Sequence, residues 1–178
     1  MAKSVIKALF QGEQVVTESS PEAKELYDKS RFGTLKSNGQ VVLSLLEACY
    51  LVEKKRLEVY TASGRKKLSF DDLVKKAKRL NRQFLVKYAV FSDIRNRGYI
   101  IKTALKFGAD FRVYDRGIKP GEDHARWVVF PVNEADTLTW HEFAAKNRVA
   151  HSTKKKLLIG VVDEEGDVSY WECRWVKP

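Results

Sequence analysis

The second half of the chain contains five short segments rich in β-branched and aromatic residues, and these restrict the possible folds more than any other feature. Glycine, proline or acidic residues separate them, as expected for strands joined by turns. A helical segment, 139–152, lies between the third and the fourth, and its first residues form a capping-box pattern. We therefore predict a mixed sheet flanked by helices, with strands within 99–107, 110–115, 126–132, 156–163 and 168–176.

The first half combines a predicted hairpin with predicted helices. Apolar residues lie on both sides of Gly12 within residues 4–18, which indicates a hairpin turn at this glycine. Segments 20–30, 44–59 and 69–84 each begin with a serine and carry apolar residues at helical spacing, which is typical of capped amphipathic helices.

A further helix is predicted over 88–98, with Gly98 at its C-terminal end, and the strand-rich part follows it. The chain has 178 residues, of which 44% are hydrophobic, so a sizeable buried core is expected. We predict an α+β fold with a boundary near residue 86. An N-terminal mixed α/β domain would span 1–86, and a C-terminal domain with the mixed sheet would span 87–178.

The charge balance favours a polyanionic partner. Lysine and arginine outnumber aspartate and glutamate by 33 to 23, which gives a formal net charge of +10 and a pI near 9.6. Such a balance suits nucleic acid, although it also serves solubility alone. The predicted third helix has a basic face that either contacts RNA or is simply solvated. This face consists of Lys75, Lys76, Lys78 and Arg79.

The two cysteines give no support for a zinc protein, and the N-terminal segment gives none for a membrane or secreted protein. Cys49 and Cys173 lie far apart and belong to no metal-binding spacing, so we expect two buried thiols and no zinc site. The apolar run within residues 1–13 is too short for a membrane span and lacks the h-region of a secretory signal. We therefore expect a cytoplasmic protein.

Two side chains and one lysine run are candidates for chemistry. Strand alternation in 110–115 turns Tyr114 away from the core face, where packing with a hydrated hydroxyl is the alternative role. His124 follows a loop that contains Pro120 and two glycines, and loops on rigid scaffolds often carry catalytic groups, although a lone histidine is also compatible with an incidental role. The lysine run 154–156 precedes a predicted strand, and its ordinary interpretation is solvated charge.

Four stretches in one order resemble the archaeal tRNA-intron endonuclease family in its short, single-repeat, homotetrameric form: KFGADFRVYDRG, PGEDH, RVAHSTKKKLLIGVVD and the terminal VKP. The resemblance covers nearly the whole chain and implies a restriction-endonuclease-like catalytic domain. By motif, the family's catalytic tyrosine, histidine and lysine fall on Tyr114, His124 and Lys155. Many members have arginine at the position of Lys154, so Lys154 and Lys156 are competing candidates.

These residue types suit RNA cleavage through the 2′-hydroxyl, which needs a base, an acid for the leaving 5′-oxygen and positive charge for the phosphate. A histidine titrates near neutral pH, whereas a phenol becomes a base there only beside cations that lower its pKa. The substrate supplies its own nucleophile, so we expect no metal or cofactor, and products with 2′,3′-cyclic phosphate and 5′-hydroxyl ends. A metal-dependent nuclease is an alternative, although its candidate carboxylates match no metal motif: Asp115, Glu122 and Asp123.

The resemblance also implies how RNA is held. The family recognises a bulge-helix-bulge in precursor tRNA and holds a bulged base between cationic side chains of a neighbouring subunit. By motif these positions are Arg148 and Trp175, the second being arginine in some relatives. A helix C-terminal cation is the alternative role of Arg148, and strand packing is that of Trp175.

An acidic hairpin tip is the last candidate, and it is either solvated or an interface. The family inserts this loop into a basic groove of a neighbouring subunit, which implies a homotetramer built as a dimer of dimers. The alternatives are the catalytic subunit of a heterotetramer with a structural partner, and a non-catalytic RNA-binding protein of the same fold. The tip consists of Asp163, Glu164, Glu165 and Asp167.

Overall fold

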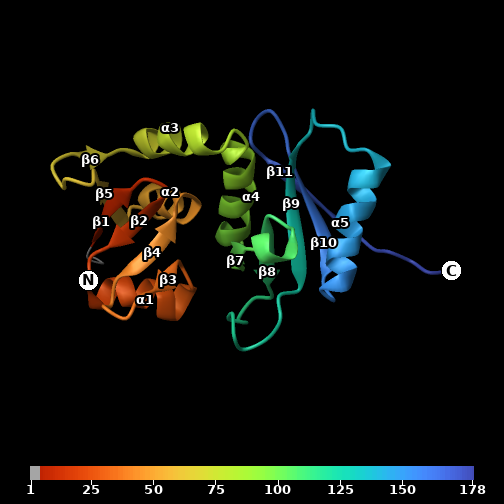
Figure 1. The fold of residues 1–178 in the computed structure, drawn as a ribbon, viewed down its shortest axis with the longest axis horizontal. Helices are drawn as coiled ribbons and strands as arrows, with labels where there is room; N and C mark the ends of the chain where they lie inside the picture. Colours follow the sequence, from red (N-terminus) through yellow and green to blue (C-terminus); the bar gives the residue numbers. More distant parts are fainter. Residues whose placement is uncertain (1–4) are drawn as a thin grey trace. The chain divides into compact units, whose positions relative to one another are not determined.

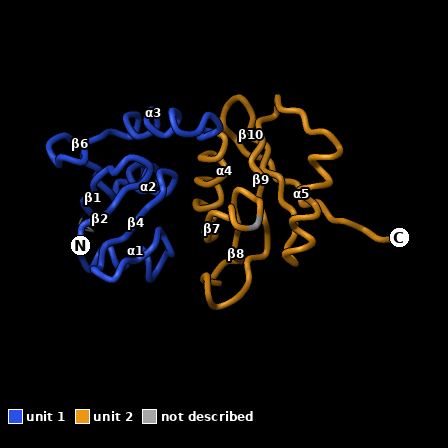
Figure 2. Tube along the Cα trace, in the orientation of Figure 1, with its two compact units in different colours: residues 1–85 blue, residues 86–178 orange. Residues whose placement is uncertain are grey.

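The computed structural model describes residues 5–178, apart from the side chain of Phe107. The chain divides into two compact units, Met1–Leu85 and Val86–Pro178 (Figure 2), and the expected boundary lay at residue 86. Each unit combines one β-sheet with helices, so the predicted α+β class is confirmed. No helix in the described part of the chain is long and apolar enough to cross a membrane.

The first unit is built on a six-stranded sheet in the order β3-β4-β2-β1-β5-β6 (Figure 1). Strands β1 and β2 form the predicted hairpin, and Gly12 in its turn has a φ of 74°, which favours glycine. Strand β5 runs parallel to β1, and the other pairs are antiparallel. The strands are β1 Ile6–Gln11, β2 Gln14–Thr17, β3 Thr34–Leu35, β4 Val41–Ser44, β5 Leu57–Tyr60 and β6 Lys67–Leu68.

Serine side chains begin the helices of this unit, which are α1 (Pro21–Ser30), α2 (Leu45–Glu53) and α3 (Phe70–Leu80). Each serine accepts a hydrogen bond from a backbone N–H of the first turn, so a donor that the helix leaves unsatisfied finds a partner. In α2 the cap also includes buried Glu47, which accepts from the N–H of Ser44 at 3.0 Å and from the N–H of Gly33 at 2.8 Å.

Two predicted helices are shorter than their apolar patterns. The helix expected within 44–59 ends at Glu53, because Lys55 takes a left-handed conformation with a φ of 55° and the chain turns back into β5. The helix predicted within 69–84 is also shorter than expected. It ends at Leu80, and Phe84 is the first residue of α4. Strand pairing with β1 outweighs local helical preference in the first case.

The second unit contains a five-stranded sheet in the order β11-β10-β9-β8-β7. Neighbouring strands are antiparallel except β9 and β10, which run parallel because helix α5 connects them. All five predicted strands are present, but the first stops at Thr103 and a 3₁₀ turn follows at Leu105–Phe107. The strands are β7 Ile100–Thr103, β8 Phe111–Tyr114, β9 Trp127–Asn133, β10 Lys156–Val162 and β11 Val168–Cys173.

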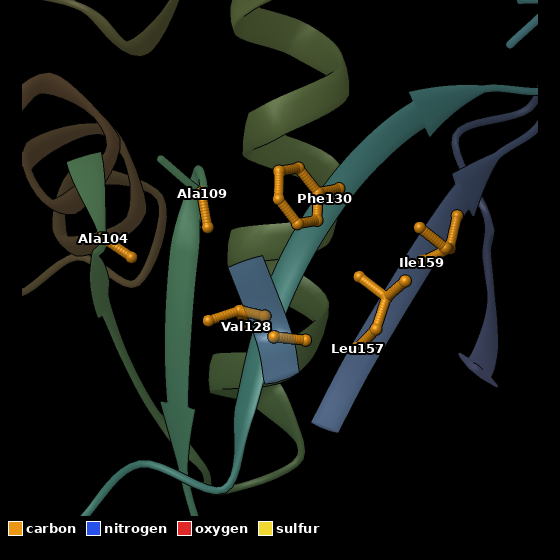
Figure 3. Packing of buried hydrophobic residues seen from close by; sticks show 7 residues of the cluster. Ala104, Ala109, Val128, Phe130, Leu157 and Ile159 are labelled. Atoms are coloured by element: carbon orange, nitrogen blue, oxygen red, sulfur yellow. The ribbon is translucent and has the colours of Figure 1, made fainter. Parts of the chain in front are cut away.

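Helices α4 (Phe84–Asn96) and α5 (Trp140–Ser152) cover the two faces of this sheet (Figure 1). On the α5 side, Leu157 and Ile159 of β10 pack with residues of β9 and with Ala150 of the helix (Figure 3). On the α4 side, Gly160 leaves room for the helix, since a Cβ there would lie 3.0 Å from the Cγ2 of Val90. Both faces of the sheet are therefore covered by apolar packing against a helix.

The two thiols lie in different environments. Cys49 in α2 is fully buried, as predicted, and burial raises the pKa of its thiol to about 12. Cys173 at the end of β11 is half-buried, so the expectation of a buried thiol is wrong there, because β11 is the edge strand of its sheet. Burial also raises the pKa of Cys173, so neither thiol is activated as a nucleophile.

Candidate active site

The register of three strands brings distant parts of the chain to one edge of the second sheet. Trp127, the first residue of β9, pairs with Val113 of β8 and also with Lys156 of β10. Because β8 ends where β9 and β10 begin, Tyr114, the loop before Trp127 and Lys155 meet at the same edge. Backbone hydrogen bonds of 2.9 Å from Arg126 N to Val113 O and from Lys156 N to Arg126 O continue this row.

A cavity of about 350 Å³ opens at this edge, and we call it the edge cavity. Its lining includes the tyrosine, the histidine and the lysine that the family motif indicates, so the fold brings them together although up to 41 positions separate them. The lining residues are Arg112, Tyr114, Gly121, Glu122, Asp123, His124, Ala125 and Lys155.

Tyr114 is more enclosed than its place at a strand end suggested. Its exposed fraction is 4%, so only a small part of its surface faces the edge cavity. The sequence had suggested a side chain that leaves the core face at the strand end. It shares a strand face with Arg112, and the Arg112 Cζ atom lies 5.9 Å from the centre of the tyrosine ring. The phenol therefore lies next to a cation.

The loop that carries His124 is held by its own carboxylates. The backbone N–H of His124 donates to Asp123 at 2.6 Å, and that of Lys119 donates to Glu122 at 3.0 Å. Asp115 and Arg126 form an ion pair of 2.9 Å across the base of the loop. His124 itself is exposed, so a substrate can reach it.

The three carboxylates near this cavity each bind a group of the same loop or at its base: Glu122 the N–H of Lys119, Asp123 the N–H of His124, and Asp115 the side chain of Arg126. Within residues 5–178, no group of three or more His, Cys, Asp or Glu side chains is arranged to hold a metal ion.

The three neighbouring lysines lie in different places. Lys155 is half-buried, lines the edge cavity and donates from Nζ to the carbonyl oxygen of Thr153 at 3.0 Å. Lys154 is exposed, with a left-handed φ of 53°, and Lys156 forms an ion pair of 3.1 Å with Glu172 on β11. Hydrogen bonds from Trp127 and Lys156 lower the pKa of Glu172 to about 2, so this carboxylate holds Lys156 in the sheet.

A second cavity, of about 610 Å³, lies between α5 and the C-terminal segment that follows β11, and we call it the tail cavity. Arg148 and Trp175 both line it. His151, which the sequence did not single out, contacts the Trp175 ring edge-on at 4.6 Å between ring centres. The spacing of three residues from Arg148 along the helix could have identified it. The lining is Phe143, Ala144, Asn147, Arg148, His151, Arg174, Trp175 and Val176.

The acidic tip is a tight turn between β10 and β11. Asp163 accepts hydrogen bonds of 2.9 Å from the N–H groups of Glu165 and Asp167, so its carboxylate stabilises the turn itself. Glu164, Glu165 and Asp167 are exposed. Glu134, which sequence reasoning missed, accepts from the N–H of Glu164 at 2.9 Å and adds a carboxylate to the tip. An interface role of this tip stays a prediction.

The basic face of α3 has an ordinary arrangement. Lys75, Lys78 and Arg79 are exposed, and Lys76 extends over the ring of Phe10 with its Nζ 4.9 Å from the ring centre. The apolar stem of Lys76 thus packs on the first sheet while its charge meets the aromatic face. RNA contact by this face stays a prediction.

Comparisons with known proteins agree over both units. Residues 84–170 match the family described as tRNA intron endonuclease, catalytic C-terminal domain, and residues 6–74 match tRNA intron endonuclease, N-terminal domain. The tRNA-splicing endonuclease of Pyrococcus furiosus is 40% identical over 98% of this chain and 99% of its own length. The protein of the same name from Thermococcus onnurineus is 39% identical over 98% of this chain and 99% of its own length. The one from Nanoarchaeum equitans is 46% identical over 76% of this chain and 90% of its own length.

Proposed function

Because the chain belongs to the tRNA intron endonuclease family, we propose that it excises introns from precursor tRNA by cutting both splice sites of a bulge-helix-bulge motif. The observation that carries this proposal is the edge cavity, where Tyr114, His124 and Lys155 line one space. A phosphodiester group bound in this space would meet a phenol, an imidazole and an ammonium group. The reaction is that of a tRNA-intron lyase, because no water is consumed.

The proposed step is a transesterification in which each residue has one role. Tyr114, as the phenolate, takes the proton of the 2′-hydroxyl while the 2′-oxygen forms a bond to phosphorus. The bond from phosphorus to the 5′-oxygen breaks, and His124, as the imidazolium, gives its proton to that oxygen. One proton is taken and one is given, and the products are a 2′,3′-cyclic phosphate and a 5′-hydroxyl. Lys155 stabilises the charge that develops on the phosphate oxygens.

Cleavage of a bulge-helix-bulge RNA by the purified chain in EDTA, with analysis of the product ends, tests this function. We expect cutting at both splice sites, cyclic phosphate and 5′-hydroxyl ends, and no cutting of the same RNA with 2′-deoxy nucleotides at those sites. Tyr114→Phe should lose cleavage while it still binds the RNA. A requirement for magnesium after chelation would overturn the mechanism, and an active Tyr114→Phe variant would remove the assigned base.

Substrate binding is assigned to the tail cavity. Arg148 and Trp175 line this space together, and aromatic and guanidinium groups are the surfaces on which unpaired bases stack. We propose that this cavity of one subunit holds a bulged base of the RNA that a neighbouring subunit cuts. The packing of Trp175 against His151 keeps an indole available at the opening, since its exposed fraction is 62%.

A homotetramer, built as a dimer of dimers, is the proposed assembly. Two splice sites require two active sites in fixed register, whereas one chain carries one set of the three groups. The exposed carboxylates of the acidic tip would bind a basic surface of a neighbouring subunit. Glu164→Lys combined with Glu165→Lys should therefore give smaller particles in light scattering, with weak cleavage; unchanged tetramers would remove this interface. The control is Glu13→Lys, an exposed change in the β1–β2 turn.

The two alternatives lead to different results in the same experiments. If the purified chain folds and cuts only after a second protein is added, it is the catalytic subunit of a heterotetramer. If it binds the RNA and never cuts, it is a non-catalytic RNA-binding protein of the same fold. The proposed cytoplasmic location is tested by fractionation of cells that produce the chain.

A further inference from the structure

The edge cavity contains a cation that the family motif does not name. Arg112 precedes Tyr114 by two residues on β8, so both side chains emerge from the same strand face. Arg112 is half-buried with its Nε atom enclosed, and it lines the cavity together with Tyr114, His124 and Lys155.

The charges around this cavity call for a second cation. The lining includes two carboxylates, Glu122 and Asp123, so Lys155 alone would leave an excess of negative charge where a phosphodiester must bind. Arg112 restores the balance, and the imidazolium form of His124 then makes the cavity positive. Two further carboxylates near the cavity belong to ion pairs and are absent from its described lining, Asp110 with Lys87 at 2.6 Å and Asp115 with Arg126 at 2.9 Å.

The strand order places the two cations on different sides of the cavity. Arg112 belongs to β8 and Lys155 directly precedes β10, with β9 between these strands. Neighbouring strands lie about 4.8 Å apart, so the two backbones are separated by roughly 10 Å, a gap that a phosphate group and two side chains can fill. A guanidinium group presents two parallel N–H donors to phosphate oxygens, which an ammonium group cannot do.

We propose that Arg112 is a further catalytic residue, whose guanidinium group binds a non-bridging oxygen of the scissile phosphate opposite Lys155. This assignment rests on the proposed function. The Arg112 Cζ atom lies 5.9 Å from the centre of the Tyr114 ring, so the guanidinium group and the proposed base lie on the same side of the cavity. Because a guanidinium group stays protonated at all relevant pH values, this cation is present whatever the state of the histidine.

Arg112→Gln tests the proposal, with Arg116→Gln as the matched control. Arg116 also extends over a tyrosine, with its Cζ 4.9 Å from the ring centre of Tyr99, but it is absent from the described lining of the edge cavity. In single-turnover cleavage of the bulge-helix-bulge RNA, Arg112→Gln should be slower by about 10²- to 10³-fold, the typical effect of removing one transition-state donor. The control should stay within about 2-fold of the unchanged chain.

Three readouts separate catalysis from a structural role. Affinity for the uncleavable 2′-deoxy RNA should change by at most about 3-fold, because one of many phosphate contacts is lost. Added guanidinium ion should restore part of the rate of Arg112→Gln and have no such effect on the control. Arg112→Lys, which keeps the charge but loses the fork, should be about 10-fold slower than the unchanged chain. Arg112→Lys also decides the question if Arg112→Gln does not fold.

Each outcome has a definite meaning. If the unchanged chain cuts and either Arg112 variant that folds cuts at the same rate, Arg112 is not catalytic, and the proposed function stands. If the rate falls together with the melting temperature and guanidinium restores nothing, Arg112 is a packing residue only. If the unchanged chain never cuts this RNA, the proposed function fails and the role of Arg112 fails with it.

Discussion

The edge cavity and the tail cavity belong to the same unit but are built from opposite kinds of group. The edge cavity has charged side chains from β8, from the loop before β9 and from Lys155 directly before β10, and its tyrosine is almost fully buried. The tail cavity has aromatic and aliphatic surfaces, two arginines and a tryptophan that is largely exposed. Rigid placement of charge suits bond breaking, whereas an open aromatic surface suits an unpaired base. We therefore expect variants in the edge cavity to change the cleavage rate and variants in the tail cavity to change the affinity for RNA.

Among the variants that compare the two cavities, we expect a large effect at Lys155, because it is the lysine that lines the edge cavity. Lys155→Gln should slow single-turnover cleavage by about 10²- to 10³-fold with little change in affinity for the uncleavable RNA. Its neighbour supplies the control, since Lys154→Gln removes an equal charge from an exposed position and should cost less than about 3-fold. Reversed effects of these two variants would move the catalytic role to Lys154.

Arg148 should show the opposite behaviour. Arg148→Ala removes a cation from the tail cavity, and a cation–π contact contributes about 0.5–2 kcal/mol, so the Kd for the uncleavable RNA should rise by roughly 2- to 30-fold. The cleavage rate at saturating enzyme should stay within about 3-fold. A fall in that rate with unchanged affinity would erase the distinction between the cavities. Lys146→Ala on the same helix, whose Nζ lies over the Phe130 ring, is the control.

Trp175 is expected to have a smaller effect of the same kind. Trp175→Ala should weaken RNA binding by roughly 3- to 10-fold, since aromatic contacts contribute about 0.5–1.5 kcal/mol each. Its melting temperature should hardly change, because 62% of the residue is exposed. A clear loss of stability with unchanged binding would instead assign the indole, together with His151, to packing of the tail on α5.

Glu172 connects the two regions and should give the smallest effect. Its carboxylate accepts from Trp127 and Lys156 near the edge cavity and from Arg174 of the tail, and these partners hold its pKa at about 2. Since this pKa is below the value of about 4.3 in the unfolded chain, the carboxylate stabilises the fold above pH 4.3, and this contribution disappears as the pH falls towards 2. Glu172→Gln should therefore lose about 1 kcal/mol at pH 7, a value reduced by solvent screening.

Urea unfolding of both proteins at pH 7 and at pH 3 measures this difference. The difference between the two stabilities should fall by about half at pH 3, because the carboxylate of the folded chain is still mostly charged one pH unit above its pKa. A gap that is equally large at pH 3 would mean that the charge of Glu172 contributes nothing.

Much of the local structure was predictable because it depends on neighbouring residues. Serine and threonine caps defined where α1, α2 and α5 begin, and short segments rich in β-branched and aromatic residues identified all the strands of the second sheet. The motif order also identified the family, which the comparisons confirm. The helix predicted over 44–59 was too long at its C-terminal end. Residues 57–59 were included in this predicted helix but pair with β1, so a partner some fifty positions away decides their structure.

In the candidate site too, some residues could be predicted from the sequence and others only from the folded chain. The resemblance to the family was enough to name a tyrosine, a histidine and a lysine, because the motifs that carry it are local in the sequence. The choice among three adjacent lysines, the presence of Arg112 beside Tyr114, and the contact of His151 with Trp175 depended on the folded chain. The physical reason is strand register: Trp127 pairs with both Val113 and Lys156, and only that long-range pairing determines which side chains share one cavity.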